Sequence, residues 1–109
     1  MKRGHIVTVA LQGDYGKPRP AVIIQSNRFL DGHPSVLICP ITSHLLDVPL
    51  LWIEVQPSPH NGLKNPSRIM ADRIVTMRPE RIGRTIGELD TRTLKRLDRV
   101  LALIVGLTE

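Results

Sequence analysis

Arg19 stands between two prolines, and both of them restrict the backbone around it. Pro18 and Pro20 fix their own φ angles, and Pro20 also favours an extended conformation at Arg19. The apolar run that follows predicts a buried strand at residues 21–25. We therefore expect a guanidinium on a stiff backbone at the mouth of a strand, where it could bind phosphate oxygens. A solvated basic turn is an equally good interpretation of these residues alone.

Thr42 and Ser43 supply two hydroxyl groups just beyond another predicted strand, residues 35–39, which we expect Pro40 to close. Hydroxyl donors beside a guanidinium could complete an anion pocket. An RNA substrate would need little more, because its own 2′-hydroxyl supplies the nucleophile. The protein would then have to position the phosphate, stabilise the extra charge and move two protons. RNA cleavage is therefore one of several chemistries that these residues permit.

Metal chemistry and a nucleophilic serine find little support in the sequence. The histidines at positions 5, 33, 44 and 60 are scattered without a ligand pair at short spacing, and Cys39 is the only cysteine. No phosphate-binding glycine loop and no strained serine elbow can be recognised. We therefore expect no metal and no cofactor. His44 stays of interest because it adjoins the hydroxyl pair.

The composition predicts one small basic domain that spans residues 1–109. The net charge of +5 favours an anionic partner, although a merely basic surface would give the same value. The aromatic content of 3% is too low for a base-stacking platform and leaves the core to Val, Ile and Leu. The lone cysteine, the missing signal-peptide pattern and the lack of a long apolar run predict a cytoplasmic protein with no membrane partner.

Short apolar runs between turn residues predict a mainly β chain. We expect strands at residues 5–11, 21–25, 35–39, 50–55, 68–77 and 82–86. Asp72 and Arg73 interrupt the fifth of these strands, and residues 56–66 hold enough Pro, Gly and Asn to form a loop. A charged residue in a strand is usually paired, so a salt bridge to Arg68 or Arg73 is the simplest role for Asp72.

The clearest helix is predicted to begin after Asp90, a good N-cap residue, and to end before Gly106. Apolar residues recur there at three- and four-residue steps, namely Leu94, Leu97, Leu101 and Ile104. Strands followed by one helix predict a mainly β (α+β) fold in which the helix packs on the sheet.

Three motifs follow one another along the chain. The first is residues 13–26, Gly-Asp-Tyr-Gly-Lys-Pro-Arg-Pro-Ala-Val-Ile-Ile-Gln-Ser. The second is Pro-Ile-Thr-Ser at residues 40–43, and the third is Asn-Gly-Leu-Lys-Asn-Pro-Ser at residues 61–67, which leads to Met-Ala-Asp-Arg at residues 70–73. These motifs resemble the signatures of the MazF/PemK family of bacterial toxins. Each motif is moderately specific, but they follow the family's order over nearly the whole chain.

The resemblance implies an SH3-like barrel of bent antiparallel strands with a C-terminal helix. It also implies the toxin of a type II toxin–antitoxin system, a homodimer that cuts single-stranded RNA. Such toxins are sequence-selective, metal-independent endoribonucleases in which the 2′-hydroxyl attacks the phosphate. The expected protein partner is a small acidic antitoxin whose extended tail occupies the RNA groove.

By motif match, Arg19 resembles the arginine taken as general acid or phosphate stabiliser. Thr42 resembles the residue that contacts the scissile phosphate. We expect three further contacts with RNA, from Lys17, Gln25 and Ser43.

Asp72 matches an acidic residue that the PemK branch of the family uses as a base. That branch carries an arginine two residues earlier, where this chain has Met70, and its longer first loop holds a histidine that is missing here. Asp72, His44 and a bound water therefore all remain candidates for the general base.

Two other functions compete with RNA cleavage. A CcdB-like poison of DNA gyrase would share the fold, but that family relies on its last residues, including a tryptophan, and this chain ends in Val-Gly-Leu-Thr-Glu. A non-catalytic module could instead use Arg19 only to bind an anion or nucleic acid. The sequence does not indicate which RNA motif would be cut, because base choice depends on loop shape.

Overall fold

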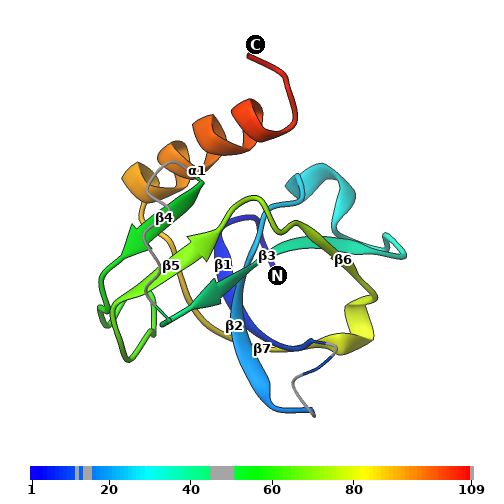
Figure 1. Cartoon of the computed structure of the whole chain (residues 1–109). Coiled ribbons are helices and arrows are strands. Elements are labelled where there is room, and N and C mark those ends of the chain that lie inside the picture. The colour runs from blue at the N-terminus through cyan, green and yellow to red at the C-terminus, as the bar shows by residue number, and fades with distance from the viewer. Residues whose placement is uncertain (12, 14–15, 45–50, 109) are drawn as a thin grey trace.

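The computed structural model describes residues 1–11, 13, 16–44 and 51–108 of the chain. The strands are β1 (His5–Ala10), β2 (Pro18–Ile23), β3 (Val36–Thr42), β4 (Trp52–Val55), β5 (Ser67–Met70), β6 (Val75–Met77) and β7 (Ile82–Glu88). The helices are two short 3-10 turns, η1 (Asn27–Phe29) and η2 (Pro79–Arg81), and the α-helix α1 (Thr91–Ile104). Bent strands curve around one another, and α1 lies outside them beside β4 (Figure 1).

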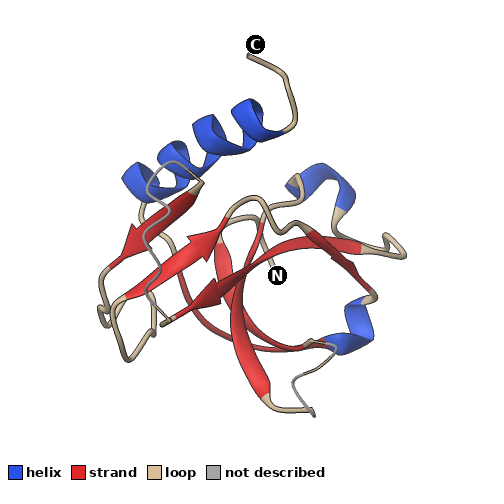
Figure 2. Ribbon diagram, viewed as in Figure 1, coloured by secondary structure: helices blue, strands red, loops and turns tan. Residues whose placement is uncertain are grey.

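The strands pair antiparallel in the order β4-β5-β3-β2-β1-β7, and β6 pairs with β3. Strand β3 joins the two parts of this arrangement, because it pairs with β2 along one edge and with β6 and β5 along the other. Figure 2 shows that strands make up most of the fold and that the long helix ends the chain. The predicted mainly β fold with a C-terminal helix is thus confirmed.

Alternate residues of the central strands enter two hydrophobic clusters, because successive side chains of a strand point to opposite faces. In β1, Ile6 belongs to one cluster, whereas Val7 and Val9 belong to the other. Helix α1 covers the first cluster and inserts Leu97, which is fully buried. Burial on both faces fixes the register, because a slip by one residue would exchange the two sets of side chains.

Pro40 does not end its strand, as the sequence analysis expected, but lies inside β3. Its neighbours explain this. Along one edge of β3, residues 36–38 pair with β6, whereas residues 41 and 42 pair with β5. Pro40 falls between these two registers, where its missing N–H breaks no ladder bond on that edge. The strand therefore continues through Pro40 to Thr42.

Strand β2 begins at Pro18 rather than at Ala21, where the sequence analysis placed it. Pro18 and Pro20 pair only with β1, because the pairing of β2 with β3 starts at Ala21. Prolines are tolerated at such an unpaired edge, since no donor is required there. Arg19 lies between them opposite Val9, in the extended conformation that the two prolines favour.

Other boundaries differ from the predicted ones by smaller amounts. The strand predicted at residues 68–77 is divided into β5 and β6 by a turn at Ala71 and Asp72. Strand β7 runs to Glu88 rather than to Ile86, and β1 ends one residue early. Asp14 and Tyr15 of the first motif lie outside the described residues, as does Leu50 of the strand predicted at residues 50–55.

Both ends of α1 match their predicted caps. The side chain of Asp90 accepts a hydrogen bond from the backbone N–H of Thr93 at 2.7 Å, and this bond holds the pKa of its carboxyl below its usual value. At the other end, Gly106 has a φ of 81° and donates to Leu103, while Leu107 donates to Ala102. Within the described part of the chain, no helix is long and apolar enough to cross a membrane.

Candidate active site

A groove of about 660 Å³ opens between the start of β2, the end of β3, the loop of residues 56–66 and the middle of β7. Apolar, hydroxyl and cationic side chains line it. The polar lining residues are Thr8, Arg19, Thr42, Ser43, His44, Lys64, Asn65, Ser67 and Arg84. The groove therefore brings together residues from all three sequence motifs, although these motifs lie far apart in the chain.

Arg19 is the second residue of β2, is exposed, and lines the groove. The backbone beneath it is held by the flanking prolines and by pairing with β1. A cation on such a support loses little freedom when it binds an anion, which favours tight and oriented contact with a phosphate.

Thr42 ends β3, and a local hydrogen bond orients its hydroxyl group. The backbone N–H of His44 donates to Thr42 Oγ1 at 3.0 Å. Because the oxygen accepts this bond, its own hydrogen stays available to be donated toward the groove. Ser43 and His44 continue the lining directly after the strand.

Asn61 organises the loop of residues 56–66 from inside. Its side chain is 6% exposed and forms hydrogen bonds to three backbone groups. The amide oxygen accepts from Ser58 and Leu63, and the amide nitrogen donates to Gln56 at 2.8 Å. These bonds fix the backbone that leads into Lys64. The loop forms one wall of the groove, and the buried amide that holds it has hydrogen-bond partners for both its oxygen and its nitrogen.

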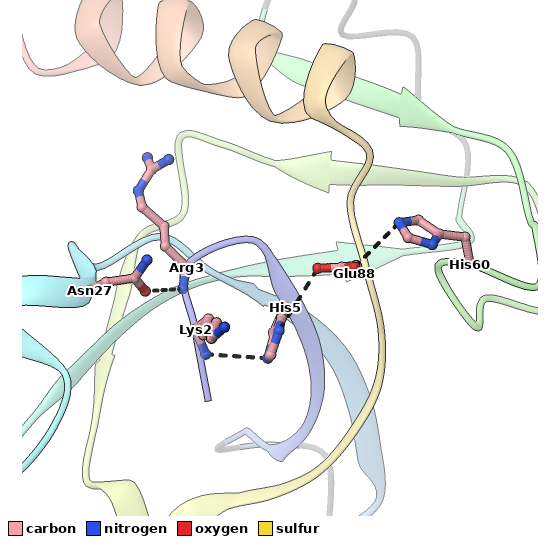
Figure 3. Close-up of polar contacts among 6 residues, drawn as sticks. All are labelled: Lys2, Arg3, His5, Asn27, His60 and Glu88. Carbon is pink, nitrogen blue, oxygen red and sulfur yellow. Dashed lines mark hydrogen bonds and ion pairs between the residues drawn. The ribbon is translucent and has the colours of Figure 1, made fainter.

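The same loop packs tightly against β7. Gly62 has a φ of 71°, and a Cβ at this position would overlap the carbonyl oxygen of Ile86. Glu88 donates its backbone N–H to the carbonyl of His60 at 3.1 Å. Its carboxylate lies between two histidines, 3.6 Å from His60 Nε2 and 3.9 Å from His5 Nε2 (Figure 3). The loop thus contacts β7 through Glu88, and the same carboxylate lies beside β1.

The charged groups of the groove are cationic. Besides Arg19, it is lined by Lys64 from the loop and by Arg84 from β7, and none of the described lining residues is acidic. The backbone N–H of Arg84 donates to Thr8 Oγ1 at 3.2 Å, which ties β7 to β1 beside the groove. Such a lining attracts a chain of phosphates.

Lys64 and Arg84 were not predicted as site residues. Lys64 could have been found, because it lies inside the third motif. Arg84 stands alone in a short predicted strand, and only the pairing of β7 with β1 brings it to the groove.

Comparison with known proteins identifies the family. The model of the PemK-like, MazF-like toxins of type II toxin–antitoxin systems matches residues 2–105. The chain belongs to this family. The family resemblance of the three motifs is thus confirmed. A curated relative, the probable endoribonuclease MazF of Mycolicibacterium smegmatis, is 40% identical over 108 residues, with 98% of each chain covered.

Solved structures of other toxins share the MazF-like fold. An endoribonuclease in complex with its cognate antitoxin, from a mycobacterial species, has a TM-score of 0.83 at 23% identity, covering 100% of this chain and 98% of that one. Mycobacterium tuberculosis toxin MazF-mt6 has a TM-score of 0.80 at 24% identity, with 94% and 96% covered. A MazE–MazF complex from Deinococcus radiodurans has a TM-score of 0.74 at 22% identity, with 97% and 95% covered.

Two residues of this MazF-like toxin that we expected to contact RNA do not line the groove. Lys17 is exposed and immediately precedes Pro18, which does line the groove. Gln25 is only 8% exposed, and its amide bonds to the backbone of Phe29, Ser35 and Leu37 at 2.6, 3.0 and 3.0 Å. These bonds fasten η1 and the start of β3 to β2.

Asp72 also lies outside the groove lining. Its carboxylate accepts a hydrogen bond from Trp52 Nε1 at 2.9 Å, and the guanidinium of Arg73 lies over the same indole, 5.5 Å from the ring centroid. Arg68, a partner proposed for Asp72 from the sequence, contacts Glu54 at 3.0 Å. Among the described residues, the contact of Asp72 is thus with an indole rather than with an arginine.

Cys39 is unsuited to nucleophilic chemistry. Its thiol is fully buried in the core, and burial, together with the nearby charge of Asp72, raises the pKa of Cys39 to about 12. Within the described part of the chain, His, Cys, Asp and Glu side chains form no group of three or more that could hold a metal ion.

Proposed function

We propose that this MazF-like toxin binds single-stranded RNA in the groove and cuts it there. The observation that carries the proposal is the lining itself, which places Arg19 and Thr42 in one groove with Lys64 and Arg84 and with no described acidic residue. Cations attract and hold the RNA backbone, and a fixed guanidinium with a hydroxyl donor can stabilise the extra charge of a reacting phosphate.

The proposed reaction uses the RNA's own 2′-hydroxyl and no metal. The 2′-oxygen attacks the adjacent phosphorus, and the bond to the 5′-oxygen of the next nucleotide breaks. Arg19 binds the non-bridging oxygens as their charge grows, and the hydroxyl of Thr42 donates a further hydrogen bond. The products are a 2′,3′-cyclic phosphate and a free 5′-hydroxyl.

We further propose that the toxin works as a homodimer and is inhibited by an acidic antitoxin. Exposed apolar side chains at the end of α1 offer surface that a second copy could bury, namely Leu103, Val105 and Leu107. A disordered acidic segment that folds into the cationic groove would cover Arg19 and exclude RNA. Solved relatives include endoribonuclease and MazF structures in complex with their antitoxins.

Incubation of the purified protein with a long single-stranded RNA tests the activity. We expect cleavage in excess EDTA, and 2′,3′-cyclic phosphate ends on the products. Replacement of the ribose 5′ of the cut by deoxyribose should abolish cleavage, because it removes the nucleophile. Inhibition of DNA gyrase without RNA cleavage would favour the CcdB-like alternative, and neither activity would favour a binding module.

The Arg19→Ala variant tests the site. Loss of a cation that stabilises the reacting phosphate should lower the cleavage rate by about 10³-fold or more. The fold should survive, because the side chain is exposed. Arg28→Ala is the matched control: Arg28 is also exposed but belongs to η1, outside the groove. Wild-type cleavage by a folded Arg19→Ala protein would refute the assignment.

A further inference from the structure

We infer that the imidazole of His44 is the general base that removes the proton from the attacking 2′-hydroxyl. This inference rests on the proposed RNA cleavage and assigns a residue to a role that the proposed reaction leaves open. Few of the described side chains that line the groove can accept a proton.

Among the described residues that line the groove, His44 is the only one whose side chain carries a ring nitrogen that can accept a proton. The charged groups that line the same groove come from three other elements: Arg19 on β2, Lys64 on the loop and Arg84 on β7. Guanidinium and ammonium groups carry protons already and can only donate. The remaining polar neighbours are hydroxyls and an amide, which are poor bases.

The position of His44 also suits the role. Its backbone N–H bonds to Thr42 Oγ1 at 3.0 Å, so the imidazole and the threonine hydroxyl belong to one tight turn. If Thr42 contacts the scissile phosphate, His44 lies only two residues further along the chain from the residue that makes this contact. His44 is exposed, and no hydrogen bond joins its ring to another described residue, so a ring nitrogen is available to the substrate.

Asp72, the competing candidate, is engaged elsewhere. Its carboxylate accepts the indole N–H of Trp52, and it does not line the groove. A general base must come within hydrogen-bond distance of the proton that it removes. The geometry thus favours the imidazole over the carboxylate.

Every proton and every bond of the proposed step can be accounted for. Neutral imidazole takes the proton of the 2′-hydroxyl while the 2′-oxygen forms its bond to phosphorus. The bond from phosphorus to the 5′-oxygen breaks, and that oxygen leaves with the electron pair and takes a proton from water. The imidazolium of His44 then returns its proton to solvent, which the open groove admits.

Single-turnover cleavage of a saturating RNA tests the inference with His44→Gln and His44→Ala. Loss of a general base should slow the chemical step by about 10²–10⁴-fold. The affinity for RNA should change little, because the backbone N–H that orients Thr42 is kept. The dependence of the cleavage rate on pH should differ between the wild-type protein and both variants, because the proposed proton acceptor is removed, and added imidazole should partly restore His44→Ala. His33→Gln is the control, since His33 is exposed but lies outside this groove.

A substrate with sulfur in place of the leaving 5′-oxygen separates a base from an acid, because a thiolate leaves without a proton. The defect of His44→Gln should persist on this substrate. Its disappearance would show that His44 acts as an acid, and an unchanged rate and pH profile in His44→Gln would equally overturn the inference. Failure of the proposed function looks different, because the wild-type protein would then not cut RNA at all.

Discussion

Arg19 and Thr42 bring different kinds of donor to the proposed reaction. The guanidinium carries a permanent charge and several N–H groups, whereas the hydroxyl contributes one neutral hydrogen bond. A neutral donor to a charged oxygen stabilises it by about 1.5–3 kcal/mol, less than a full positive charge in the same place. The two side chains should therefore contribute unequally, although they line the same groove.

Thr42→Ala tests this ranking. We expect cleavage to slow by about 10- to 100-fold, which corresponds to one lost hydrogen bond to a charged group. Thr42→Ser should restore most of the rate, because it returns the hydroxyl. Single-turnover rates of both variants should be compared with that of Arg19→Ala. A loss at Thr42 equal to or larger than the loss at Arg19 would reverse the assigned roles.

At the level of single residues, the sequence is most informative where local chemistry constrains the backbone. Arg19 could be singled out because two prolines fix its position, and Thr42 because it ends an apolar run. Gln25 and Asp72 show the limit of such reasoning. Both are polar residues inside the matched segments, but tertiary contacts engage them, Gln25 with backbone groups and Asp72 with Trp52. No sequence pattern reveals these contacts.

Between elements, the packing of the 56–66 loop on β7 sets the shape of one groove wall. Gly62 makes this contact possible in two ways, through its positive φ and through the missing Cβ. The chain offers a second glycine that separates these effects. Gly32 has a φ of 72°, close to the 71° of Gly62, but nothing lies within 4 Å of a Cβ built there.

Gly62→Ala should therefore destabilise the protein more than Gly32→Ala. Gly32→Ala carries only the strain of a positive φ, about 1 kcal/mol. Gly62→Ala adds the overlap with Ile86 and must displace the loop, so RNA cleavage should fall as well. Thermal melting and cleavage rates of both variants provide the measurement. Equal losses of stability at the two positions would show that the contact with β7 contributes nothing.

The prolines explain why β2 and β3 were predicted as strands but with the wrong first or last residues. From the sequence, Pro40 was expected to end a strand, and Pro18 and Pro20 to precede one, because proline cannot donate to a ladder. In the structure each falls where β2 or β3 lacks a partner on one edge. Which edges lack a partner depends on the order of strands in the sheet, and local sequence does not carry that information.

For the whole molecule, assembly is the next question, because a chain of this size buries a limited core. Apolar side chains stay exposed at the end of α1, and Val105 and Leu107 are 55% and 78% accessible. We expect static light scattering at micromolar concentration to give about twice the monomer mass of 12.2 kDa. A strict monomer that cuts RNA at the full rate would contradict the proposed homodimer.

The charge of the groove predicts how RNA binding responds to salt. Each cation that neutralises one phosphate of a single strand contributes about −0.7 to the slope of log K against log salt concentration. Arg19, Lys64 and Arg84 together predict a slope of about −2 for each groove. Binding of a 2′-O-methyl RNA, which lacks the nucleophile, can be titrated without cleavage.

Substitution of the two cations that the sequence analysis missed gives the sharpest test. Lys64→Ala and Arg84→Ala should each lower the magnitude of the slope by about 0.7 and weaken binding most at low salt, because each removes one phosphate contact. Thr42→Ala removes no charge and should leave the slope unchanged, as should Arg28→Ala outside the groove. A slope that stays the same in Lys64→Ala and Arg84→Ala would place the RNA backbone on another basic surface, and the exposed arginines of α1 would then be the first to replace.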